Sequence, residues 1–216
     1  MKNKYRFYGF NEAYDAILKM GEDLDGEEPA RLFSDLIQYP DPEGKELEKL
    51  KKLYIHVTRD DAKGFLVGLL GIRSFKKSFF VMLDYLYSYS QKIENDSIRA
   101  ILKKYSLDAE VNLEPDDCDT IVSVMLGFLQ TPCPEVRNSD EFMFKDLDKF
   151  RVELHKREIA MWILVVLDHY PPTPSRSRMM IQEKADLIVC YDESDYSLGV
   201  FPKTLGYCLS QWKEIR

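Results

Sequence analysis

The sequence predicts a mainly α-helical protein with a small antiparallel β element near the C-terminus, an α+β fold. Three observations support this prediction. Apolar residues recur with the three-to-four-residue spacing of a helix through most of the 216 residues. Nine consecutive apolar residues, 159–167, follow an amphipathic stretch that begins near Asp140 and predict a buried central helix. Two short β-prone runs, 186–191 and 196–201, flank a turn-like tetrapeptide and predict a hairpin.

The first half of the chain predicts a series of amphipathic helices. Asn11 is suited to cap a helix that ends at Gly21, and Pro29 fits the first turn of a helix that runs to Gln38. The stretch 39–44 is rich in proline and interrupts the helical pattern. Further helices are expected over 47–57, from Ser74 onward, and from 96 to 105. In the helix that begins at Ser74, residues 84–90 alternate in character, so its last turn could instead be extended.

The second half predicts three more helices and the β element. Pro115 and the acids after it indicate a helix start, and 131–134 (TPCP) ends that helix. Ser139 is suited to cap the long central helix, and 204–215 predicts a closing helix after the hairpin. The aromatic run Tyr5–Phe10 is a candidate third strand.

The apolar run also allows a different fold. Trp162–Leu167 is rich in strand-forming residues, so the alternative is an α/β protein in which this segment is a buried central strand. Nine residues are too few to cross a bilayer, which takes roughly 20. We therefore expect no membrane span. We also expect a single globular domain, 1–216. Two tightly packed subdomains are the other possibility: a helical 1–108, and 109–216 with helices, hairpin and closing helix.

The charge of the chain is unevenly distributed. Net charge is −7, and residues 109–216 carry 12 basic and 19 acidic side chains. No basic residue occurs between Lys104 and Arg137. A surface of this kind repels the nucleic-acid backbone and attracts a basic protein. We therefore expect a protein partner with a basic surface and no nucleic acid.

The cysteines and the N-terminus predict a cytoplasmic protein. The four cysteines form no C-x-x-C pair, and the N-terminal residues lack the apolar stretch of a signal peptide. We expect reduced cysteines, no metal and no cofactor. A divalent-metal site built on His155 and Glu158 is disfavoured, because only two other histidines exist and two basic residues lie between these ligands.

Eight residues are candidates for partner binding. The acids at the predicted helix start also suit the helix dipole, and the arginines lie on a predicted proline-stiffened loop, 171–180, that could hold an anionic group. The remaining three lie at the predicted hairpin turn, where turn chemistry alone explains acidic residues. The eight are Asp116, Asp117, Asp119, Arg176, Arg178, Tyr191, Asp192 and Glu193.

Two functions from different classes remain open. The favoured hypothesis is a cytosolic acidic protein-binding module, such as an inhibitor, an immunity-type protein or an adaptor. The alternative is a hydrolase-like enzyme in which Asp168 and His169 supply a general base while Arg176 or Arg178 binds an anionic group. The enzyme hypothesis requires the α/β fold, since it places Asp168 and His169 at the carboxyl end of a strand.

Overall fold

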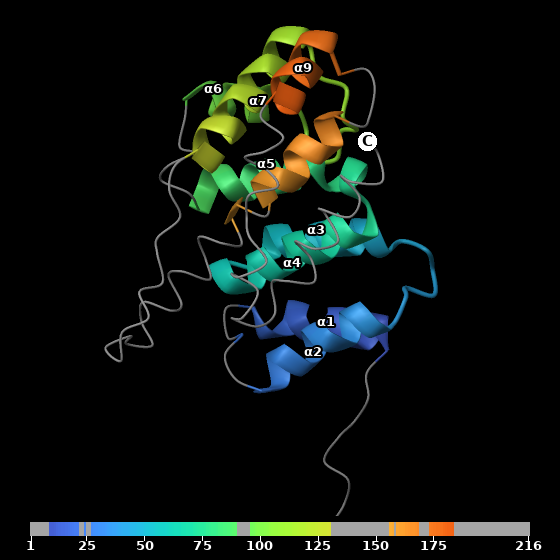
Figure 1. Ribbon diagram of the computed structural model, residues 1–216. Helices are drawn as coiled ribbons and strands as arrows, with labels where there is room; N and C mark the ends of the chain where they lie inside the picture. The colour runs from blue at the N-terminus through green and yellow to red at the C-terminus, as the bar shows by residue number, and fades with distance from the viewer. Residues whose placement is uncertain are drawn as a thin grey trace, which may run out of the picture. The chain divides into compact units, whose positions relative to one another are not determined.

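The described part of the protein is mainly helical (Figure 1). A computed structural model describes residues 9–21, 24, 27–89, 96–130, 156–157, 159–168 and 173–183. None of these residues lies in a β-strand, so the mainly α-helical class is confirmed for them. The predicted hairpin, the closing helix and residues 5–8 lie outside the described residues. Phe10, expected at the end of a strand, is instead the first residue of a helix.

The chain divides into two compact units, Met1–Ser74 and Phe75–Arg216. The first unit contains α1 (Phe10–Met20), α2 (Glu27–Gln38), α3 (Glu46–His56) and α4 (Asp60–Arg73). Helix α1 packs on α2 and α3, and α3 packs on α4. The core of this unit consists of aliphatic side chains with no exposed surface. They include Ile17, Leu32, Leu36, Leu50, Leu53 and Leu66.

Local sequence explains two of the helix ends in the first unit, the end of α1 and the start of α2. Gly21 ends α1 with a φ of 61°. Residues that carry a Cβ rarely adopt this backbone conformation. Pro29 lies in the first turn of α2, as predicted. The Asn11 prediction is wrong: Asn11 lies inside α1, and the capping residue is Gly9, which has no side chain. Asn11 instead accepts a hydrogen bond from Lys49 Nζ, at 2.7 Å.

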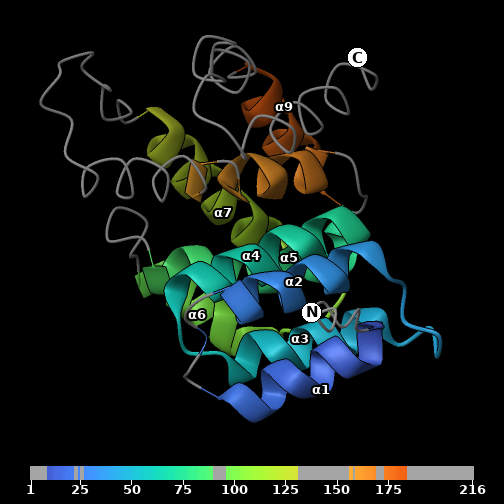
Figure 2. The same ribbon diagram turned by 90° about the horizontal axis from the view of Figure 1, so that it is seen from below.

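Helices α1 and α3 run parallel and are joined at two points. Asn11 meets Lys49 near the start of both helices, and the ring nitrogen Nε2 of His56 lies 3.1 Å from the carbonyl of Leu18 near their ends. The two points are seven residues apart on each helix, which is about two turns. Figure 2 shows α1 and α3 side by side. These polar contacts fix the register of the two helices.

The second unit contains α5 (Phe75–Tyr89), α6 (Asp96–Lys104), α7 (Pro115–Gln130) and α9 (Ser175–Glu183). Helix α5 packs on α6, α6 on α7, and α7 on α9. Helix α5 is regular to Tyr89, so its last turn is not extended. Between α7 and α9 in the sequence, residues 159–168 form a further helical segment, drawn in orange beside α9 in Figures 1 and 2.

The α/β alternative is wrong, because Trp162–Leu167 is helical. Every residue from Ile159 to Leu167 is at most 3% exposed, so the prediction that this run is a buried helix is confirmed over this range. Strand propensity reflects how a side chain packs against its neighbours, and a segment surrounded on all sides can satisfy its β-branched residues as a helix. Two residues before this segment, the Arg157 guanidinium lies over the Phe128 ring of α7, 5.4 Å from its centroid.

The prediction of a loop over 171–180 is also wrong for its second half. Ser175–Glu183 forms α9, so Arg176 and Arg178 lie on a helix. The carbonyl of Pro174 accepts the hydrogen bond of Arg178 N, at 3.1 Å, and this bond opens the helix. A proline at a helix start loses nothing, because the first backbone N–H groups have no partner within the helix. Within the residues that the structure describes, no helix has the length and apolar character needed to cross a membrane.

Candidate binding surface at the start of α7

The start of α7 is organised around the hydroxyl group of Tyr105. This hydroxyl accepts a hydrogen bond from Glu114 N, at 3.0 Å, and donates one to Asp117 Oδ2, at 2.9 Å. In a capping box, the side chain three residues into the helix bonds directly to the N–H of the capping residue. Here the Tyr105 hydroxyl stands between these two groups. The Tyr105 ring stacks on Phe80 of α5, with centroids 5.2 Å apart, and this contact holds the hydroxyl in place.

Lys104 joins the same group of residues through its ammonium. Its Nζ lies 2.8 Å from Glu114 Oε2 and 2.8 Å from Asp117 Oδ2. The hydrogen bonds to Asp117 and then to Glu114 raise the pKa of Lys104 above its ordinary value, although partial burial opposes this. Burial alone would raise the pKa of Asp117, but the hydrogen bonds from Lys104 and Tyr105 outweigh it and hold that pKa below the ordinary value. Both groups stay charged at neutral pH.

Asp119, two residues further along α7, contacts α9. Ser177 Oγ donates a hydrogen bond to Asp119 Oδ1, at 2.5 Å, and Arg176 Nε lies 3.4 Å from Asp119 Oδ2. Ser177 is fully buried, whereas the Arg176 side chain is 82% exposed. The structure therefore brings together two of the predicted binding residues, Asp119 and Arg176. Arg178 is half-buried on the same helix.

Four acidic side chains point toward solvent around the start of α7. We call these the α7 acidic surface: Asp108, Glu110, Glu114 and Asp116. Among the described residues, the carboxylate of Asp116 has no hydrogen-bond or ion-pair partner. Glu110 lies 3.1 Å from Lys76 Nζ, but both side chains are more than a third exposed. Exposed ion pairs are worth about 0–1 kcal/mol, so such a contact leaves the carboxylate available to a partner.

Sequence reasoning missed the two lysines at this surface. Lys76 precedes Glu110 by 34 residues, and Lys104 lies at the edge of the stretch that lacks basic residues. Folding places both against carboxylates, so the surface is less negative than the local sequence indicates. The predicted set Asp116, Asp117 and Asp119 therefore divides: Asp116 faces outward, and the other two make internal contacts.

The structure describes only some of the residues on which the enzyme hypothesis and the predicted hairpin site depend. Asp168 is half-buried near the end of the helical segment 159–168, and its Oδ1 lies 3.4 Å from Gln182 Nε2 of α9. Its position is on a helix, so the strand end on which the enzyme hypothesis depended is absent there. His169, Tyr191, Asp192 and Glu193 lie outside the described residues. Within the described ranges, no three His, Cys, Asp or Glu side chains are grouped to hold a metal ion.

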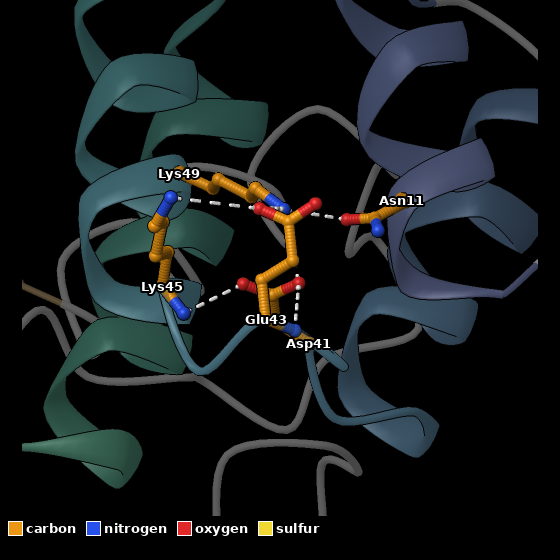
Figure 3. Close-up of polar contacts among 5 residues, drawn as sticks. All are labelled: Asn11, Asp41, Glu43, Lys45 and Lys49. Carbon is orange, nitrogen blue, oxygen red and sulfur yellow. Dashed lines mark hydrogen bonds and ion pairs between the residues drawn. The ribbon is translucent and has the colours of Figure 1, made fainter.

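A second polar cluster, in the first unit, was not predicted at all. Asp41 Oδ1 lies 2.9 Å from Lys49 Nζ and accepts a bond from Glu43 N, while Asp41 Oδ2 accepts one from Lys45 N, at 2.7 Å. Figure 3 shows Lys49 between Asp41 and Asn11. The sequence Asp-Pro-Glu-Gly is typical of a type I turn, and this signal could have identified Asp41 as the first residue of the turn.

Comparisons of this chain with protein-family models, with curated proteins and with solved structures found no match.

Proposed function

We propose that this protein acts by binding another protein, and that the α7 acidic surface meets a basic region of the partner. The observation that supports this proposal most directly is the outward-facing carboxylate of Asp116. It lies in the first turn of α7 and next to the exposed Glu114. Complementary charge steers a partner toward such a surface and speeds association at low salt. An inhibitor, an immunity-type protein or an adaptor would each use a surface of this kind.

The fixed geometry around Asp116 also supports the proposal. Tyr105, Lys104 and Asp117 hold the first turn of α7 through contacts of 2.8–2.9 Å, so the backbone that carries Asp116 is already ordered. A surface ordered before binding loses little conformational entropy when the partner arrives. Because Asp117 and Asp119 make internal contacts, we assign them a positioning role and expect direct partner contact at Asp116 and Glu110.

The test is a pull-down from a lysate of the source cell at low and at high salt, with mass spectrometry of the bound proteins. The wild-type chain is compared with the double variant Glu110→Lys, Asp116→Lys. We expect a stoichiometric basic partner that binds the wild type at low salt and is lost at high salt. The double variant should associate with it about tenfold more slowly, because steering depends on these charges.

A matched control separates the surface from the net charge. Asp15→Lys, Glu48→Lys reverses two exposed carboxylates on α1 and α3 and changes the net charge by the same amount. This control should retain the partner. Equal loss of the partner in both variants, or undiminished capture by the Glu110 and Asp116 variant, would contradict a binding role for the α7 acidic surface. Circular dichroism of each variant checks that the helices are intact.

A further inference from the structure

Two lysines of the protein itself contact the carboxylates at the start of α7. Lys104 Nζ lies 2.8 Å from both Glu114 Oε2 and Asp117 Oδ2. Lys76 Nζ lies 3.1 Å from Glu110 Oε2. A partner with a basic surface would bring lysine or arginine side chains to the same oxygen atoms, because complementary charge is what such a partner offers. The free protein therefore already pairs these carboxylates with the kind of cation that we propose they meet.

Lys104 is held in a site that suits an ammonium. Its Nζ lies over the Tyr105 ring, 5.5 Å from the centroid, while the two carboxylates approach it at hydrogen-bonding distance. An aromatic face and charged acceptors each attract a cation. The first turn of α7 and the end of α6 thus form a cation site, and the protein's own lysine occupies it.

Both lysines can leave these positions without a change of fold. The side chains of Lys104 and Lys76 are 42% and 37% exposed, and those of Glu114 and Glu110 are 68% and 62% exposed. Ion pairs between exposed side chains contribute little to stability, because water solvates both groups well. A cation from a partner therefore displaces either lysine at a small cost, and that cost lowers the affinity for the partner.

We propose that Lys104 and Lys76 are internal competitors of the partner: in the free protein they occupy carboxylates of the α7 acidic surface that a partner's lysine or arginine must take over on binding. This inference rests on the proposed function and adds a regulation of the same site. A cation that meets the surface by chance exchanges one ion pair for another and gains little. The competition therefore lowers binding to scattered positive charge, and a specific partner must compensate through its other contacts.

Displacement and simple binding differ in their response to salt. When a partner cation displaces an internal lysine, the number of ion pairs is unchanged, so screening by salt weakens the lost pair and the gained pair alike. When the lysine is absent, the same contact is a net gain of one ion pair, and added salt weakens binding more steeply. Removal of Lys104 should therefore tighten binding at low salt and steepen its salt dependence.

The experiment measures binding of a fluorescein-labelled octalysine peptide to the full-length chain by fluorescence anisotropy, at a series of NaCl concentrations. The variants are Lys104→Met and Lys76→Met, which keep an unbranched stem and remove the charge. The matched control is Lys103→Met, which changes the net charge equally. Lys103 precedes Lys104 on α6, is exposed, and makes no ion pair within the described part of the chain. We expect Lys104→Met and Lys76→Met each to bind the peptide about two- to fivefold more tightly than Lys103→Met at low salt.

The competition is overturned if neither Lys104→Met nor Lys76→Met exceeds Lys103→Met in affinity, because net charge alone then accounts for the effect. Urea unfolding followed by circular dichroism checks that α7 is intact. If Lys104→Met weakens it, Lys76→Met decides, because Glu110 lies before the helix. The two proposals fail separately. Undiminished capture of the partner by Glu110→Lys, Asp116→Lys contradicts the proposed function, whereas equal peptide binding by the lysine variants contradicts the competition alone.

Discussion

Asp41 organises the connection between α2 and α3, because three donors converge on its one buried carboxylate. They are the ammonium of Lys49 and the backbone N–H groups of Glu43 and Lys45 (Figure 3). Burial alone would raise the pKa of Asp41, but these hydrogen bonds outweigh it and hold the pKa below its ordinary value. Lys49 is affected in the complementary way: burial opposes its charge, and its contacts with Asp41 and Glu43 raise its pKa.

This lowered pKa predicts a loss of stability in acid. The folded form binds the Asp41 proton less readily than the unfolded form, whose pKa is about 3.9. Asp41 therefore contributes fully to the free energy of unfolding above about pH 4. This contribution disappears as the pH falls through the lower, folded-state pKa of Asp41. The measurement is urea unfolding followed by circular dichroism. Asp41→Asn should be less stable than the wild type at pH 6, and its free energy of unfolding should fall less than that of the wild type between pH 6 and pH 3.

The control for this prediction is Glu43→Gln in the same turn. The Glu43 side chain is 54% exposed and lies 3.4 Å from Lys49 Nζ, so its charge is screened by solvent. This variant should keep the acid sensitivity of the wild type. If the wild type and Asp41→Asn lose stability in parallel between pH 6 and pH 3, the acid response arises from other carboxylates, such as Asp117.

At the scale of single elements, two glycines differ in whether their position tolerates a Cβ. Gly44 closes the turn before α3 with a φ of 70°, where a Cβ is strained. Gly127 lies on the exposed face of α7, and a Cβ built there meets nothing within 4 Å. An alanine at Gly127 would lower the entropy of the unfolded chain and improve helix propensity, whereas one at Gly44 must adopt a left-handed conformation.

We therefore expect the same chemical change to have opposite signs at these positions. Gly127→Ala should raise the free energy of unfolding by about 0.5–1 kcal/mol. Gly44→Ala should lower it by about 1–2 kcal/mol. Urea denaturation of the two variants beside the wild type measures both. Stabilisation by Gly44→Ala would mean that the turn relaxes to a negative φ at little cost.

The elements also show how far the sequence determines the structure. Apolar periodicity is a local signal, and it located α2, α3 and α7 to within a few residues. Helix α4 was not predicted, because three glycines over Gly64–Gly71 lower helix propensity and tertiary packing overrides it. The partners of the charged residues could not be predicted. Ser177 meets Asp119 across 58 residues, and no local spacing encodes such a pair.

At the scale of the whole molecule, the excess of acidic residues gives every copy of the protein a net negative charge. Net charge is −7 at pH 7, and the isoelectric point is about 5.1. Repulsion between like-charged molecules opposes association, and it vanishes when the net charge reaches zero. We expect solubility to pass through a minimum near pH 5 and to recover on either side, as measured by light scattering across a pH series.

Net charge and local surface can be separated with the two charge-reversal variants. Glu110→Lys, Asp116→Lys and Asp15→Lys, Glu48→Lys each replace two acids by two bases, so each should move the solubility minimum to higher pH by the same amount. Association with the partner should differ between them, because steering depends on where the charges lie near the binding surface. If the two variants also lost partner binding equally, net charge alone would govern association, and the position of Asp116 on α7 would have no part in it.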